Sequence, residues 1–275
     1  MERLQAAIEK AREQRATVQT PSSGLLSTNA SAAVAAVEDA WLALPEIKHR
    51  RRLLHHNRIV AYQSGQAAAP YDILRTRLIQ QAQANKWRRI AIVSPRSSCG
   101  KTTTAANLAF GLGRQSGIRS IVMDFDLRRC GLGRILGQKG RAAMADVLEE
   151  QVPFEEVARR HGRNLIFGLS FGASQRASEI LQSQQTRKVL KAIEASYTPN
   201  FMIFDLPPLS AGDDNFGFLS HVDAALIVAE AERTSLAQID VAERQVAELT
   251  NVMGVVLNKC RYASNAYGHE EGYYY

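Results

Sequence analysis

Residues 89–105 read RRIAIVSPRSSCGKTTT, an apolar run followed by a loop and then by residues with helical spacing. The apolar run from Ile90 to Val93 suits a buried parallel strand. Between Thr103 and Leu112, alanine and leucine recur at the intervals of one helix face. A strand, a tight loop and a helix in this order direct free backbone N–H groups and the positive end of a helix dipole at a phosphate. This stretch therefore predicts a nucleotide-binding site.

The loop carries half of the Gly-x-x-x-x-Gly-Lys-Thr pattern, because Pro95 stands at the position of its first glycine. Gly100 lets the backbone approach an anion, Lys101 reaches the outer phosphates, and the Thr102 hydroxyl is the usual magnesium ligand. Gly-Lys-Thr alone arises by chance in many chains, so the prediction depends on the strand and helix around it. The loop residues expected to bind nucleotide are Ser97, Ser98, Cys99, Gly100, Lys101, Thr102 and Thr103.

Two further apolar runs end in carboxylates. Residues 120–128 read SIVMDFDLR and supply Asp124 and Asp126, and residues 201–208 read FMIFDLPP and supply Asp205. A single strand that ends in Asp is weak evidence, because Asp is common at turns. A lysine that binds phosphate, together with acids that bind magnesium and accept a proton, forms the main part of a phosphoryl-transfer site. Magnesium gives up its water reluctantly, so we expect Asp205 to act mostly through bound water.

Composition limits the class of protein. A chain of 275 residues with 45% hydrophobic residues is long enough for one large α/β core. No apolar run approaches the length of a membrane span, and the N-terminus lacks the apolar region of a secretory signal. The three cysteines, Cys99, Cys130 and Cys260, have no metal-binding spacing. We therefore expect a cytoplasmic protein with reduced thiols.

The net charge of +7 is spread unevenly. Residues 73–141 contain fourteen Lys or Arg and only two acids, which are Asp124 and Asp126, and this positive field suits a polyphosphate. A second basic run, residues 48–52, reads KHRRR. It is compatible with contact to an anionic membrane surface or an acidic partner, and equally with a solvated helix face.

The pattern along the chain predicts three parts. Residues 1–58 form a helical and linker segment, with a helix over 1–16, a linker over 17–32 and a second helix over 34–44. Residues 59–261 form the main domain, with strands over 90–93, 120–125, 164–168, 201–206, 224–229 and 253–258, and helices over 71–85, 103–112, 144–150, 178–190 and 236–249. This alternation predicts a doubly wound, mostly parallel sheet with its ligand at the carboxyl ends of the strands.

Residues 262–275 form a tail that contains five of the eight tyrosines. Its other residues are small or polar and cannot build a core. The cluster is either an incidental property of the tail or a set of hydroxyls that are modified. The five are Tyr262, Tyr267, Tyr273, Tyr274 and Tyr275.

In combination these features resemble the bacterial tyrosine kinases, which use a P-loop NTPase fold with Walker A, A′ and B motifs to regulate polysaccharide synthesis and export. The resemblance covers residues 60–275. Besides the tyrosine tail, it is carried by the loop at 94–103, DFDLR at 124–128, DLPP at 205–208, LRT at 74–76, SEIL at 178–181 and VVLN at 255–258.

The resemblance implies an ATP- and Mg²⁺-dependent protein-tyrosine autokinase. It assigns catalysis to Lys101, Asp124, Asp126 and Arg128, the metal to Thr102, Asp126 and Asp205, and a nucleotide contact to Asn258. Asp124 would accept the tyrosine proton, a role that Asp126 could exchange with it. The resembled form is a separate cytoplasmic chain held at the inner membrane by a membrane-embedded polysaccharide chain-length regulator. It modifies its own tail tyrosines in trans as a homo-oligomer and needs a tyrosine phosphatase, and no nucleic acid is expected as a partner.

Two departures from the family pattern stand out. Ser97-Ser98 occupies the place of a Pro-Gly pair, and the Glu-x-x-Arg-x-x-Arg motif for ring assembly survives only in Arg75. Two other functions remain open. Partition and cell-division ATPases share the fold, but they carry a lysine where this chain has Arg96, and they lack a tyrosine tail. The third possibility is an adaptor that binds nucleotide without transferring phosphate.

Overall fold

The computed structural model describes residues 23–261, and side chains from residue 32 onward. The helix expected over 1–16 and the tyrosine tail over 262–275 lie outside the described residues. Compact packing divides the chain into two units, residues 1–40 and residues 41–275. In the described part of the chain, no helix is both long and apolar enough to cross a bilayer.

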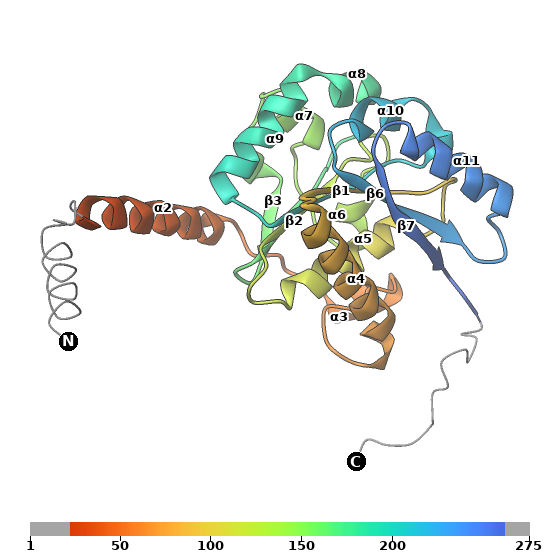
Figure 1. Cartoon of the computed structure of the whole chain (residues 1–275), viewed down its shortest axis with the longest axis horizontal. Coiled ribbons are helices and arrows are strands. Elements are labelled where there is room, and N and C mark those ends of the chain that lie inside the picture. The colour runs from red at the N-terminus through yellow and green to blue at the C-terminus, as the bar shows by residue number, and fades with distance from the viewer. Residues whose placement is uncertain (1–22, 262–275) are drawn as a thin grey trace, which may run out of the picture. The chain divides into compact units, whose positions relative to one another are not determined.

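The larger unit is built on one sheet of seven strands (Figure 1). The strands are β1 (Arg89–Val93), β2 (Ser120–Asp124), β3 (Ala158–His161), β4 (Leu165–Gly168), β5 (Phe201–Asp205), β6 (Ala224–Glu230) and β7 (Asn251–Asn258). Their order across the sheet is β3-β4-β2-β5-β1-β6-β7, and every neighbouring pair is parallel except β3 with β4. The predicted fold class is therefore confirmed.

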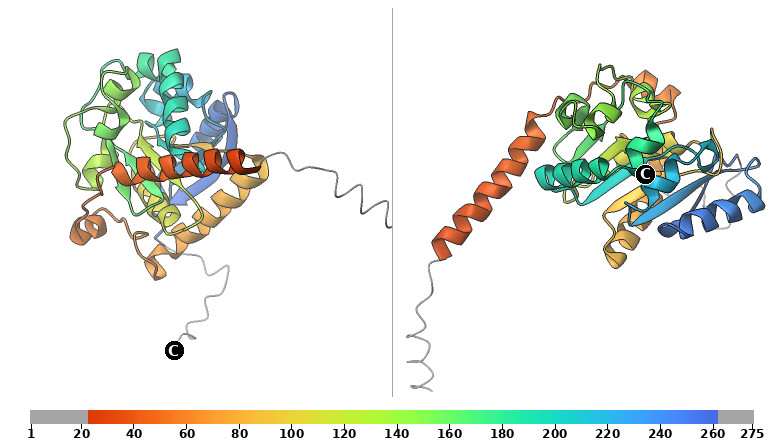
Figure 2. Two further views of the ribbon diagram at one scale, coloured as in Figure 1. Left: turned by 90° about the vertical axis from the view of Figure 1, so that its left-hand side faces the viewer. Right: turned by 90° about the horizontal axis from the view of Figure 1, so that it is seen from above.

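Helices cover both faces of this sheet (Figures 1 and 2). The α-helices are α2 (Ser23–Ala43), α3 (Arg51–His56), α4 (Ala69–Asn85), α5 (Lys101–Gly113), α6 (Gly131–Ile135), α7 (Met144–Leu148), α8 (Ala177–Gln182), α9 (Gln184–Tyr197), α10 (Asp214–Leu219) and α11 (Leu236–Ala247). Helices α4 and α5 pack together against one core, which includes Ile90, Val122 and Ile203. Phe204, on the opposite face of β5, packs edge-to-face against Phe125 and against Phe218 of α10 at ring-centroid distances of 4.9 and 5.0 Å.

Three elements differ from the expectation. Strand β3 was not predicted, because its residues Ala-Arg-Arg-His lack the apolar pattern of a buried strand. The helix expected over 178–190 is divided at Ser183, whose extended backbone and side-chain bond to the Thr186 N–H begin α9. The linker expected over 17–32 is helical from Ser23 onward, and the alanines of this segment favour a helix in spite of its serines.

Residues 41–58 pack within the larger unit. Trp41 is fully buried, and its Nε1 donates a hydrogen bond of 2.8 Å to the carbonyl of Tyr197. Farther along, Ile47 N donates to the carbonyl of Arg160 at 2.8 Å, and Arg160 N donates to the carbonyl of Pro45 at 2.9 Å. These bonds extend the sheet edge at β3, so residues 41–58 contribute to the stability of the domain predicted to begin near Ile59.

This packing predicts that Trp41→Ala destabilises the larger unit. Loss of a fully buried tryptophan with its hydrogen bond costs about 3–5 kcal/mol of unfolding free energy. The neighbouring Leu42, 41% exposed, is the control, and Leu42→Ala should change stability by no more than about 0.5 kcal/mol. Urea denaturation followed by fluorescence and circular dichroism measures both, and equal effects of the two substitutions would contradict this account.

Candidate nucleotide and phosphoryl-transfer site

The phosphate loop joins β1 to α5, as predicted. Two of its residues have left-handed backbone conformations, Ser98 with φ of 66° and Gly100 with φ of 90°. For a residue with a side chain this conformation costs roughly 1–2 kcal/mol. Ser98 stands where the resembled family has glycine, so the structure shows why that family places a glycine there.

The ends of β6 and β7 hold this loop in place. The Asn258 amide donates to the carbonyl of Cys99 at 2.8 Å. The Lys259 ammonium donates to the carbonyl of Ser98 at 2.6 Å and pairs with Glu230 at 3.1 Å. A Cβ atom at Gly100 would lie 2.1 Å from the Asn258 amide nitrogen, so no side chain fits there. Asn258, predicted to contact nucleotide, thus lies at the site and contacts the loop backbone. The contacts of Lys259 and Glu230 at this site were not predicted.

Lys101 and Asp205 form a buried ion pair at the base of the loop. Their side chains are 7% and 0% exposed, and Nζ lies 2.8 Å from Oδ1. Asp205 ends β5, which pairs with β1 on one side and with β2 on the other. The predicted lysine and the third predicted acid therefore meet directly.

Asp124 is the neighbour of Asp205 in the sheet, because the two residues are register partners on β2 and β5. One of its oxygens accepts a 2.9 Å hydrogen bond from the Leu132 N–H. The other, Oδ1, is buried without a hydrogen-bond partner, as is Oδ2 of Asp205. Burial, followed by the negative charge of Asp205, raises the pKa of Asp124 well above its usual range.

Asp126 lies two residues farther along the chain and is 6% exposed. Its Oδ1 accepts a hydrogen bond of 3.2 Å from the Arg129 N–H. Burial is the largest cause that raises the pKa of Asp126, and the Lys101 charge opposes it. Thr102 lies on the first turn of α5 next to α6, where a Cβ atom at Gly131 would be 3.5 Å from its hydroxyl oxygen.

These oxygens fit a magnesium ion that keeps part of its water shell. The unpartnered Oδ2 of Asp205 is a hard anionic ligand of the kind that Mg²⁺ accepts. Within residues 23–261, no group of three His, Cys, Asp or Glu side chains is arranged as a complete metal cage. Magnesium commonly binds one or two carboxylates together with substrate phosphates and water, so a complete cage is not required.

Arg128 is placed differently from the other predicted catalytic residues. Its guanidinium forms a two-pronged ion pair with Asp214 of α10, with bonds of 2.7 and 2.9 Å. Its side chain is 39% exposed, and that of Asp214 is 2% exposed. The pair connects the loop after β2 to α10. Asp214 was not predicted, because no local pattern identifies it as the partner of Arg128. The next residue, Arg129, donates to the Ser97 hydroxyl at 3.1 Å and joins the same loop to the phosphate loop.

Arg75, the remaining residue of the ring-assembly motif, makes its contacts inside the subunit. Its Nη1 donates to Asp72 at 2.7 Å and to the carbonyl of Gly111 at 3.3 Å, and Asp72 also pairs with Arg114. These bonds join α4 to α5. Arg96, at the position of the partition-type lysine, donates to the carbonyl of Arg233 at 3.2 Å.

Comparison with known proteins supports the interpretation of this region as the nucleotide site of a P-loop NTPase. A family model described as ParA, NUBPL iron-transfer P-loop NTPase, matches residues 86–274. The septum site-determining protein MinD of Helicobacter pylori is 31% identical over 55% of this chain and 56% of its own length. The putative tyrosine-protein kinase EpsB of Ralstonia nicotianae is 26% identical over 73% of this chain, which spans only 26% of EpsB.

Two further matches, both named as tyrosine kinases, cover most of this chain and most of the matched chain. The tyrosine-protein kinase CpsD of Streptococcus pneumoniae is 24% identical over 72% of this chain and 86% of its own length. The kinase domain of Escherichia coli tyrosine kinase ETK superposes with a TM-score of 0.65 at 22% identity, covering 75% of this chain and 80% of that one. The predicted resemblance to bacterial tyrosine kinases is confirmed.

The pKa of Asp124 leads to a stability prediction. A raised pKa in the folded state means that ionising Asp124 opposes folding. The penalty is present at neutral pH, begins to shrink as the pH falls through the raised value, and is gone once the pH is below the pKa of the unfolded chain. Asp124→Asn should therefore raise the unfolding free energy at pH 7 by about 0.5–2 kcal/mol, the range typical of a stabilising change at a functional site.

Urea denaturation at several pH values measures this gain, which should shrink as the medium becomes acidic. Asp240→Asn on the exposed surface of α11 is the matched control and should change stability little at any pH. A loss of stability in Asp124→Asn at pH 7 would show that the carboxylate charge supports the fold instead.

Proposed function

Because the chain belongs to the ParA family of P-loop NTPases, we propose that it is a protein-tyrosine kinase that transfers the γ-phosphoryl group of ATP to tyrosines of its own tail. The observation that carries the proposal is the buried lysine and carboxylate cluster of Lys101, Asp124 and Asp205, in a chain that carries five tyrosines in its last fourteen residues. The tyrosine kinases among its relatives support it.

In the proposed reaction Lys101 leaves Asp205 and neutralises charge on the outer phosphates. Bound Mg²⁺ would supply further neutralisation, with Thr102, Asp126 and Asp205 as the residues that hold it. The acceptor tyrosine oxygen forms a bond to the γ-phosphorus while the bond from that phosphorus to the bridging oxygen breaks, which releases ADP. Such a transfer needs positioning and charge stabilisation more than a strong nucleophile.

Asp124 is the proposed acceptor of the tyrosine proton. Its Oδ1 has no hydrogen-bond partner in the described structure, whereas Oδ1 of Asp126 is bound to the Arg129 N–H. The raised pKa of Asp124 also suits a group that must take up a proton near neutral pH. Asp126 has a raised pKa as well, so exchange of the two roles remains the competing assignment.

The second candidate function is that of an ATPase of the partition and cell-division type. The 31% identity to MinD favours it. Against it, Arg96 stands at the position of the lysine that marks those enzymes, and its side chain contacts the Arg233 carbonyl of the same chain. An adaptor that only binds nucleotide is the third candidate.

Lys101→Met should abolish phosphotyrosine formation, because Lys101 is the only buried lysine or arginine among the described residues. The test is incubation of the purified chain with γ-labelled ATP and Mg²⁺, followed by detection of phosphotyrosine. Lys188→Met, on the exposed face of α9, is the matched control and should keep full activity. A variant with all five tail tyrosines changed to Phe should hydrolyse ATP but label itself only weakly.

The outcomes separate the three candidates. Phosphotyrosine in the parent chain and its loss in Lys101→Met support the kinase. Hydrolysis of ATP without phosphotyrosine supports the partition-type ATPase, and nucleotide binding without either supports the adaptor. Phosphotyrosine that persists in Lys101→Met would contradict the site assignment.

The kinase is further proposed to act in exopolysaccharide or capsule synthesis, at the inner face of the membrane and in association with a chain-length regulator. This part of the proposal is supported by the family resemblance. It includes transfer between copies of the chain and a tyrosine phosphatase that restores the unmodified tail.

If a regulator completes the nucleotide site, a peptide of its cytoplasmic end should raise ATP turnover or lower the KM for ATP. Steady-state hydrolysis with and without the peptide, and with a scrambled peptide as control, measures this effect. Identical rates and affinities in all three samples would remove the regulator from the proposal and leave an autonomous enzyme.

A further inference from the structure

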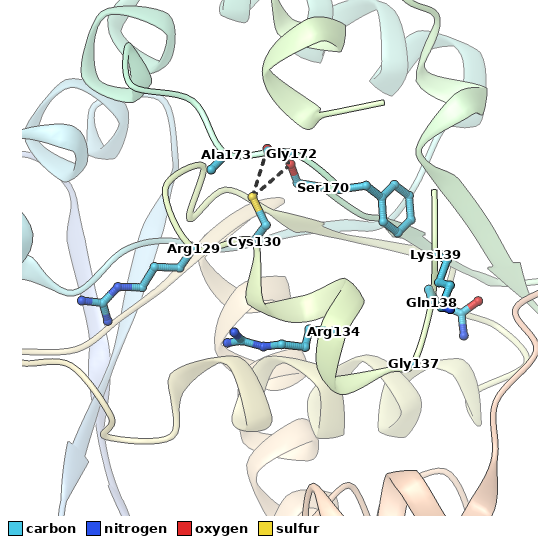
Figure 3. A pocket seen from close by; sticks show the side chains of 10 residues that line it. Arg129, Cys130, Arg134, Gly137, Gln138, Lys139, Ser170, Gly172 and Ala173 are labelled. Atoms are coloured by element: carbon cyan, nitrogen blue, oxygen red, sulfur yellow. Dashed lines mark hydrogen bonds between the residues drawn. The ribbon is translucent and has the colours of Figure 1, made fainter. Parts of the chain in front are cut away.

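A pocket of about 460 Å³ adjoins the loop that follows β2 (Figure 3). Figure 3 shows Arg129 and Arg134 extending to the same side of Cys130, with Lys139 on the other side. Every charged side chain that lines the pocket is a cation, and these are Arg129, Arg134 and Lys139. The pocket is therefore suited to a ligand that carries negative charge.

Contacts to the surrounding chain fix the walls of this pocket. The Cys130 thiol donates to the carbonyl of Gly172 at 3.1 Å and contacts the Ser170 hydroxyl at 3.4 Å, as Figure 3 shows. On the other side, the Gln138 amide donates to the carbonyl of Lys48 at 2.8 Å. A Cβ atom at Gly140 would lie 2.2 Å from the Phe171 ring, so this backbone packs directly on the ring.

No acid of the described chain forms an ion pair with the cations of the pocket, although the charge of Arg129 acts on the nearby Asp126 carboxylate and partly offsets the rise in its pKa that burial causes. Among the described residues, Arg134 and Lys139 form no ion pair and are exposed. Arg129 is exposed and uses Nη1 to bind the uncharged Ser97 hydroxyl. An anion that enters the pocket thus gains attraction without breaking an ion pair that the structure holds.

The pocket also adjoins the proposed chemistry. Arg129 contacts the phosphate loop through Ser97, and its N–H binds the carboxylate of Asp126. If the tyrosine of a peptide reaches these carboxylates, the residues next to that tyrosine therefore lie beside the pocket. An extended chain covers about 3.3–3.6 Å per residue, so an acid two or three residues from the tyrosine lies roughly 7–11 Å away from it.

We propose that this pocket selects acceptor tyrosines that follow acidic residues, and that its natural occupant is Glu270-Glu271 of the C-terminal tail. The tail reads HEEGYYY over 269–275, which places the two acids two and three residues before Tyr273. This inference rests on the proposed kinase function and specifies its acceptor. Tyr262, which has no acid beside it in the sequence, is then a poorer acceptor than Tyr273.

The test measures peptide binding and phosphoryl transfer separately. The protein is the full chain with its own Glu270 and Glu271 changed to Gln, so that its tail does not compete. The probe is a fluorescein-labelled peptide of residues 264–275, compared with a version in which both glutamates are glutamine and one in which both are lysine. Fluorescence anisotropy in Mg·ADP gives the dissociation constants, and phosphotyrosine formation with Mg·ATP gives kcat and KM.

The glutamate peptide should bind about two- to thirtyfold more tightly than the glutamine peptide, because two exposed ion pairs each contribute about 0.2–1 kcal/mol. The difference should appear in KM more than in kcat. Arg134→Glu with Lys139→Glu should abolish the preference and favour the lysine peptide. Lys188→Glu, an exposed change of equal charge on α9, is the control and should preserve the preference.

Each outcome decides one of the two proposals. Equal binding of the glutamate and glutamine peptides, or no peptide binding at all, overturns the role of the pocket even if tyrosines are phosphorylated. Charge-dependent binding that the double variant reverses supports the pocket even if no phosphotyrosine forms. In that case only the kinase function is refuted.

Discussion

The buried ion pair between Lys101 and Asp205 is the interaction on which the site depends. A charge removed from water is tolerated only when an opposite charge or hydrogen bonds compensate it, and here one ammonium faces more than one carboxylate. Burial, and after it the negative charge of Asp205, raise the pKa of Asp124, and one oxygen of each aspartate has no hydrogen-bond partner. The unliganded site is therefore short of positive charge, which is the condition that a bound cation relieves.

The sheet produces this arrangement because β1, β2 and β5 are adjacent and parallel. Their carboxyl ends meet at one edge, so the lysine that follows β1 and the acids that end β2 and β5 come together although they are far apart in sequence. The neighbouring strands β6 and β7 contribute in a different way. Asn258 at the end of β7 and Lys259 directly after it donate to the carbonyls of Cys99 and Ser98 in the phosphate loop. Glu230, the last residue of β6, pairs with Lys259.

The central strands, the phosphate loop and the three aspartates could be predicted from the sequence. An apolar run followed by Asp, or by a loop with Gly-Lys-Thr, is a pattern that a short stretch of sequence contains in full. The contacts that could not be predicted are those between distant charged residues. Asp214 and Lys259 belong to no pattern that identifies their partners, and an exposed arginine such as Arg128 gives no sign that it will form an ion pair. Strand β3 was missed for a related reason, since an edge strand needs only backbone hydrogen bonds and not an apolar sequence.

Lys259 connects the segment just before the tyrosine tail to the phosphate loop. This residue precedes the tyrosine tail by only a few positions, and its ammonium is bonded to the phosphate loop and to Glu230. A force applied to the chain beyond residue 261 acts on this anchor before it acts on the rest of the sheet. A displacement of Lys259 would therefore also act on the Ser98 carbonyl and on the left-handed backbone of the phosphate loop.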